Sequence, residues 1–415
     1  MYKSGMRHTL YVILKKGSAF IAALAILIIA TGSVSAAGQQ DSSSTNDSTS
    51  QTDDIFQQQM YDSNTDQIGN IINKYIDNES SSIYGSMNIG NIIGDIISGK
   101  LELKPATIIK AIPGYLFHEM TANISILFKL VVIAIICSLL KNLQTSFLRQ
   151  EVGEIAFFVC YAVFAAMAAL SFKTASDLGL KTIDDMVGFM YASVPVLSSL
   201  IVSSGSVISG SAFQPLMLMA AEFTASAIRN IFVPAVFLST ILYLINNLSE
   251  RIQITKLAGI IKKTTIISLG FIVTAFLAAF SVQGVLKGVA DGVAGKTIKF
   301  AISTFIPVIG GYLSDAAGAV VSCTLLIRNA AGIAVMIGLI LLCTVPLLKL
   351  LTVILLYRFS ALLVEPLSEK RIINCFGDIA DAMTVILGMV AAVAVMFIIA
   401  VSTAIGSVNT AAMMR

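Results

Sequence analysis

Beyond residue 120 the chain alternates long apolar runs with short charged loops. Six runs reach the length of about 17–25 residues that a helix needs to cross the hydrocarbon core of a membrane. They are 121–140, 155–172, 231–248, 264–286, 329–348 and 382–408. Backbone polar groups find no water in hydrocarbon and must pair within the chain, which predicts helices. The pattern therefore indicates an all-α, polytopic transmembrane helical bundle over residues 121–415.

Two further apolar segments, 186–221 and 300–327, contain residues that weaken a helix. Those expected to break it are Pro195, Pro307, Gly310 and Gly311. Proline removes a backbone donor and glycine costs conformational entropy, so each segment is predicted to form a broken hairpin. We expect six spans, or eight if the first hairpin crosses the membrane twice.

The flanks of the two hairpins are alike, which predicts an internal repeat of about 155–286 and 264–408. A Lys-Thr-Ile and an Ile-Arg-Asn triplet occur at 181–183 and 228–230 in the first copy, and at 296–298 and 327–329 in the second. Such a repeat would give two similar halves around a shared interface.

The N-terminal region predicts export. Residues 1–37 have a basic start, an apolar run and small residues before Ala37, which is typical of a cleavable signal peptide, with an uncleaved anchor as the alternative. Residues 38–66 are rich in Ser, Thr, Asn, Gln and Asp, and this composition predicts a disordered polar linker. The exported region 67–120 follows.

Two amphipathic stretches lie within 67–120. Their apolar positions recur at helical spacing and are Ile68, Ile71, Ile72, Tyr75 and Ile76, then Ile89, Ile92, Ile93, Ile96 and Ile97. One interpretation is packing against the rest of the protein. The other is a helix that lies on the membrane surface or binds a partner.

Loop charge sets the expected orientation. Loops 141–154, 249–263 and 349–381 carry lysine and arginine, and all three fall in the cytoplasm if the mature N-terminus is extracytoplasmic. The lysine-bearing segment 285–299 then falls outside and is an exception to the rule. The expected location is the cell membrane, crossed several times.

Composition identifies lipid as the solvent. Hydrophobic residues make up 56% of the chain and charged residues 12%, with a mean hydropathy of +0.86, whereas soluble proteins have about 25% charged residues. The net charge of +3 gives no reason to expect nucleic acid. The sequence holds no G-x-x-x-x-G-K-[ST], H-E-x-x-H or G-x-S-x-G motif, so we predict no enzyme and no cofactor.

The cysteines show no paired spacing. They are Cys137, Cys160, Cys323, Cys343 and Cys375. We interpret them as small packing residues and expect neither a zinc site nor a disulfide framework. Only two histidines are present, so no metal site is predicted.

Ionisable and small residues near the hairpins are the candidates for function. The ionisable ones are Glu222, Arg229, Asp315 and Arg328. Such groups within membrane segments line an ion or substrate path in one interpretation, and are ordinary boundary charges in the other. Gly284, Gly288 and Gly292 recur every fourth residue, a pattern that lets helices pack closely.

Four stretches together carry a family resemblance. They are Ala-Asp-Gly at 290–292, Ile-Pro-Val-Ile-Gly-Gly-Tyr-Leu-Ser-Asp at 306–315, Leu-Leu-Tyr-Arg at 355–358 and Val-Glu-Pro-Leu-Ser-Glu-Lys-Arg at 364–371. With the signal peptide and polar linker, they resemble the stage III sporulation protein AE family of endospore-forming bacteria. The resemblance covers most of the chain and is weakest over 38–110.

The resemblance implies a place in the mother-cell membrane around the forespore. The implied partners are membrane lipid, the stage III proteins AA to AH including a cytoplasmic ATPase, a forespore-side partner and, as a further option, other copies of this chain. The main hypothesis is a subunit of a secretion-like channel complex. The alternative is a stand-alone secondary transporter with its substrate site at the two broken hairpins.

Overall fold

The computed structural model describes residues 63–75 and 105–406, apart from gaps at 148–149, 249–253, 306–309 and 368. The predicted signal peptide, most of the polar linker and the amphipathic stretch 89–97 lie outside these residues. Inside them every element is a helix, which confirms the all-α prediction. The helices are α3 (Ser63–Tyr75), α6 (Pro105–Phe147), α7 (Gln150–Ser203), α8 (Val207–Ala227), the π-helix η3 (Ile228–Phe232), α9 (Val233–Leu248), α10 (Thr255–Phe305), α11 (Gly310–Val364) and α12 (Lys370–Gly406).

Six helical stretches in the described part of the chain are long and apolar enough to cross a membrane. They are Ile112–Leu140, Ile155–Ser203, Val207–Leu248, Thr255–Gln283, Cys323–Val364 and Lys370–Ile405. These helices support the prediction of a multi-pass membrane protein. Most of these helices are longer than the apolar runs that predict them, because helical structure continues through the charged residues at their ends.

The first hairpin turns at Gly205. α7 continues through Pro195 to Ser203, so the prediction that Pro195 breaks the helix is wrong. Gly205 has a φ of +84°, a conformation that residues with a Cβ rarely adopt, and it donates its N–H to the Val202 carbonyl at 3.0 Å. The conformational freedom of glycine, rather than the missing donor of proline, therefore ends α7.

In the second predicted hairpin, α10 ends at Phe305 and α11 begins at Gly310. Gly310 and Gly311 are the first residues of α11, and Pro307 lies in a gap outside the described residues. Whether Pro307 supplies the break stays a prediction.

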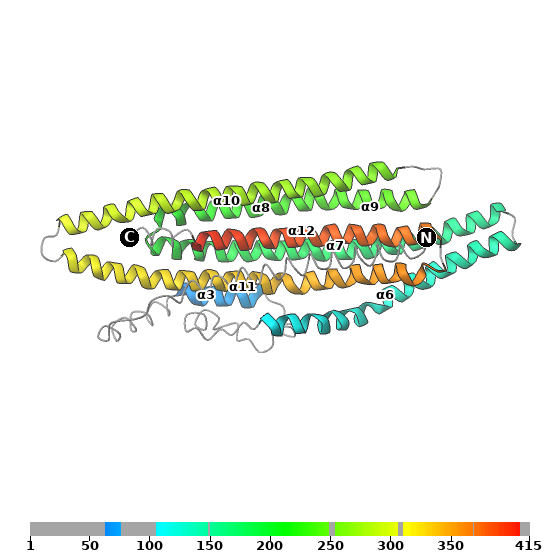
Figure 1. Ribbon diagram of the computed structural model, residues 1–415, viewed down its shortest axis with the longest axis horizontal. Helices are drawn as coiled ribbons and strands as arrows, with labels where there is room; N and C mark the ends of the chain where they lie inside the picture. The colour runs from blue at the N-terminus through cyan, green and yellow to red at the C-terminus, as the bar shows by residue number, and fades with distance from the viewer. Residues whose placement is uncertain are drawn as a thin grey trace. The chain divides into compact units, whose positions relative to one another are not determined.

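Helices α11 and α12 are the most buried candidate spans, and α7 packs against both (Figure 1). In each of the two, 67% of the most apolar window is buried, against 17–28% in the other four candidate spans. Gly332 allows the closest approach, because an added Cβ would collide with Ile405 of α12. The predicted packing glycines of α10, Gly284, Gly288 and Gly292, lie where side-chain surroundings are not described, so their role stays a prediction.

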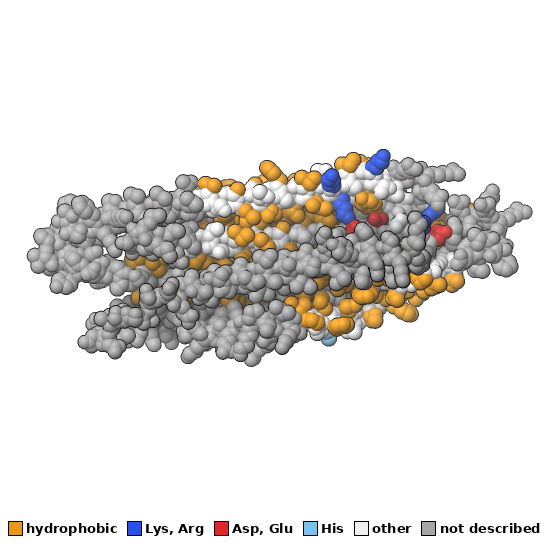
Figure 2. All heavy atoms as spheres, in the orientation of Figure 1, with side chains coloured by type: hydrophobic (Ala, Val, Ile, Leu, Met, Phe, Trp, Pro, Cys, Tyr) orange, Lys and Arg blue, Asp and Glu red, His pale blue; other side chains and the backbone are white. Residues whose placement is uncertain are grey.

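The outer helices present apolar side chains to their surroundings. Phe158 and Val163 of α7 are at least 50% exposed, and Phe271 of α10 is 74% exposed. Figure 2 shows hydrophobic side chains over much of the described surface on one face, with lysine, arginine and acidic side chains gathered towards one end. A water-soluble protein rarely exposes so much apolar surface, which agrees with lipid as the solvent.

The first amphipathic stretch forms α3, which packs on α7 and α11. Ile68 and Ile72 are fully buried, and the Tyr75 ring meets Phe189 of α7 edge-on at 6.0 Å between centroids. Of the two interpretations of this stretch, packing against the protein is observed.

Candidate functional site

Within the described residues, the largest group of paired charges surrounds Asp381 of α12. Arg358 of α11 forms a salt bridge with its Oδ1, and the Nζ of Lys262 on α10 lies 3.7 Å from its Oδ2. One turn earlier, Asp378 accepts a hydrogen bond of 2.8 Å from the side-chain amide of Asn247 on α9. The side chains of Arg358 and Lys262 are only 18% and 22% exposed. Pairing allows these charges to lie within an apolar bundle, and it joins four helices.

This cluster is not predicted from the sequence, because the charged segments that contain its members are expected to form loops. Lys262, Arg358 and Asp381 all lie in charged segments that flank apolar runs, yet the structure places each inside a helix. One signal was available: Asp378 and Asp381 are three residues apart and directly precede an uncharged run, as expected for one face of a continuing helix.

Two predicted site residues bond to α7 at the surface of the first hairpin. Arg229 in η3 forms a salt bridge with Asp184, and the two side chains are 51% and 46% exposed. Glu222 in α8 accepts a hydrogen bond of 3.3 Å from the hydroxyl of Tyr191. Glu222 and Arg229 thus contact different residues of α7 and do not pair with each other.

Arg328 of α11 is buried, with an exposed fraction of 1%. Its Nη1 donates to the Ser204 hydroxyl at 3.1 Å, and its Nη2 donates to the carbonyls of Ala404 and Ile405 at 3.0 and 2.9 Å. Those carbonyls belong to the last turn of α12, where helix geometry leaves them without a partner and with partial negative charge. Arg328 therefore joins the α7–α8 turn, α11 and the end of α12. Asp315 is also in α11, but its side chain lies outside the described part.

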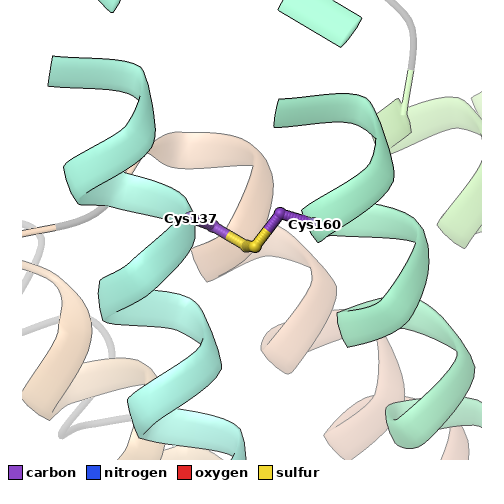
Figure 3. The surroundings of a disulfide bond; sticks show 2 residues. All are labelled: Cys137 and Cys160. Carbon is purple, nitrogen blue, oxygen red and sulfur yellow. A yellow bond between two sulfur atoms is a disulfide. The ribbon is translucent and has the colours of Figure 1, made fainter. Parts of the chain in front are cut away.

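A disulfide joins Cys137 of α6 to Cys160 of α7, with the Cα atoms 5.7 Å apart (Figure 3). The expectation that every cysteine is only a packing residue is therefore wrong for this pair. Sequence spacing gave no sign of it, because the two residues lie on different helices and meet only in the folded chain. Cys323, Cys343 and Cys375 are free thiols.

A groove of about 670 Å³ lies between the η3 region and α10. Phe223, Ile231 and Phe271 form apolar walls, and Asn230 and Ser226 contribute a polar edge joined by a 3.0 Å hydrogen bond. Within the described residues, no group of three or more His, Cys, Asp or Glu is arranged to hold a metal ion.

Comparison with known proteins gives two matches. Residues 87–408 match the family described as Stage III sporulation protein AE (spore_III_AE). The chain is also 32% identical over 394 residues to a protein of Bacillus subtilis (strain 168) named "Stage III sporulation protein AE", a match that covers 94% of this chain and 98% of that one. No solved structure matches.

Proposed function

Because the chain belongs to the stage III sporulation protein AE family, we propose that it is a polytopic membrane subunit of a channel-like complex between mother cell and forespore. The observation that carries this proposal is the length of the family match, which includes every helix from α6 to α12. A sporulation protein with six candidate spans needs a membrane, and the membrane around the forespore is the site that fits the family.

The contacts of the polar residues favour a structural subunit over a solute pathway. Arg328 caps α12, and Arg229 pairs with Asp184. Both arginines thus have partners within the chain, as expected for groups that hold helices together. The complex itself is proposed to include the stage III proteins AA to AH, with a cytoplasmic ATPase on the inner loops.

The central test is a deletion strain. Loss of the gene should stop spore development after engulfment of the forespore, and a plasmid copy should restore heat-resistant spores. A deletion strain that forms normal spores in normal numbers would rule out the proposal.

The cluster of Asp381, Lys262 and Arg358 is the one observation that favours the alternative of a secondary transporter. Charged groups between membrane helices often belong to ion-coupled transport. Purified protein in liposomes separates the two functions: gradient-driven solute uptake without partners supports the transporter, and Asp381→Asn, Glu222→Ala and Asp315→Ala would then show which groups line the path. Inert liposomes together with a sporulation defect support the subunit.

A further inference from the structure

One face of α7 changes from apolar to charged partway along the helix. Val163 and Leu170 on this face are 51% and 65% exposed. The next turns of the same face carry four exposed charged residues at spacings of three or four, which keeps them in line along a helix. These residues, named here the charged stripe, are Lys173, Asp177, Lys181 and Asp184. The surroundings of α7 must therefore differ between Leu170 and the stripe.

The opposite face of this part of α7 is packed against the bundle. Ala175 and Ile183 are buried. Gly179 lies so close to α12 that an added Cβ would be 2.6 Å from the Ile386 Cγ2. Rotation of α7 about its axis would break these contacts, so the charged stripe faces away from the chain. Within the described residues, Asp184 is the one member of the stripe with an ion pair, to Arg229.

The neighbours of the charged stripe belong to apolar candidate spans. Phe172, next to Lys173, stacks on Phe237 of α9 with 5.8 Å between the ring centroids. Gly179, in the middle of the stripe, lies beside Ile386 of α12. Phe237 and Ile386 both fall within long uncharged runs that are expected to cross the hydrocarbon core. The stripe, which extends about 16 Å along the helix axis, therefore lies at membrane depth.

The chemistry of the charged stripe favours water over lipid or protein as its surroundings. Charged side chains that face hydrocarbon are costly, and those in membrane segments face an interior, a partner or a water-filled cavity. A partner protein would need an opposite charge at every turn, because the stripe alternates lysine and aspartate. It would also have to remove these charges from water, a cost that can exceed the gain from pairing. Water solvates both signs of charge without such matching.

We propose that the charged stripe lines a water-filled vestibule, which enters the membrane along the outward face of α7 and admits hydrated ions and polar solutes. It extends from the Arg229–Asp184 pair to Lys173, and the apolar face at Leu170 marks its inner end. Because the stripe lies on the outside of this chain, other subunits supply the remaining walls. The inference thus rests on the proposed function, and it identifies the face of this chain that borders the path through the complex.

Cysteine labelling in membranes from sporulating cells tests the vestibule on the full-length protein. A charged, membrane-impermeant maleimide is applied to the stripe variants Lys173→Cys, Asp177→Cys and Lys181→Cys. The matched controls are Val163→Cys on the same face of α7, and Leu238→Cys, which follows Phe237 on α9 and is 51% exposed at the level of the stripe. We expect labelling above the wild-type level at all three stripe positions and at the wild-type level in both controls. Wild-type protein corrects for the native cysteines.

Two results would overturn the vestibule. Labelling of Leu238→Cys as strong as that of the stripe would mean that this level of the bundle lies in bulk water. Unlabelled stripe positions would mean that lipid or protein covers them. Each variant should reach the wild-type amount in the membrane and become labelled after denaturation, which shows that its thiol is present. A sporulation defect on deletion combined with an unlabelled stripe removes the vestibule alone, whereas normal spores from the deletion strain remove the proposed function.

Discussion

The Ile-Arg-Asn triplet occurs in η3 and again in α11, and the structure places the two arginines in opposite environments. Arg229 is half exposed and pairs with the half-exposed Asp184. Arg328 is buried and donates to a hydroxyl and two backbone carbonyls. The same local sequence forms a helix in both places. The surroundings decide the rest: what packs against the helix determines whether its arginine is a surface charge or a structural centre.

The largest effect is expected from Arg328→Ala. It leaves the Ser204 hydroxyl and two α12 carbonyls buried without this donor, and it creates a cavity, so the free energy of unfolding should fall by about 3 kcal/mol or more. Thermal unfolding in detergent, followed by circular dichroism, measures this loss. Arg328→Lys should retain part of the stability, since an ammonium cannot reproduce the forked geometry of a guanidinium. Equal stability of wild type and Arg328→Ala would show that the buried Arg328 contributes no more to stability than the exposed Arg229.

Gly332→Val tests the packing one turn beyond Arg328. The new side chain collides with Ile405 and pushes α12 away from α11, at a cost of about 1–3 kcal/mol. The matched control is Gly388→Ala in α12, where an added Cβ meets nothing within 4 Å. That substitution should raise stability by about 0.5–1 kcal/mol, because alanine is the better helix former. Thermal unfolding in detergent measures the stability of both variants. A Gly332→Val variant as stable as wild type would contradict the close contact between α11 and α12.

Ser204→Ala measures how much one of the hydrogen bonds of Arg328 contributes to stability. It removes one acceptor of the guanidinium and keeps the two carbonyls, so the expected loss is about 1 kcal/mol. In a double-mutant cycle with Arg328→Ala, the double variant should lose less stability than the sum of the losses in the two single variants. Full additivity would mean that the hydroxyl and the guanidinium do not interact.

The smallest effect is expected from Arg229→Ala. An exposed ion pair such as Arg229–Asp184 is worth roughly 0–1 kcal/mol, and salt screens it further. Melting curves at low and at 1 M salt should therefore differ little between the variant and wild type. A large loss that persists in salt would place Arg229 in a buried contact and remove the contrast with Arg328.

The sequence allows the helices to be predicted better than their ends. Long uncharged runs are specific for membrane-spanning helices, and the six candidate spans follow from them. Helix ends are harder to predict. α7 continues through Pro195, and the turn comes at Gly205, whose positive φ is incompatible with a continuing α-helix. Charged residues at the ends of the runs continue the helices instead of ending them.

The polar contacts could be predicted only in part. Arg229 and Arg328 are both recognisable as ionisable groups near the hairpins, but nothing local to either triplet tells which one is buried. The Asp381 cluster and the Cys137–Cys160 pair depend on contacts between separate helices, which form only when the bundle folds. Contacts of this kind belong to the arrangement of the bundle rather than to any stretch of the chain.

The Cys137–Cys160 disulfide spans the connection between α6 and α7, which is predicted from loop charge alone to face the cytoplasm. Reductants of that compartment keep thiols free, whereas an extracytoplasmic location preserves the bond. Alkylation of freshly broken cells before denaturation would therefore report which side of the membrane the α6–α7 connection faces. If the bond persists in the cell, a protease cut within this connection leaves both fragments on one band until reductant is added.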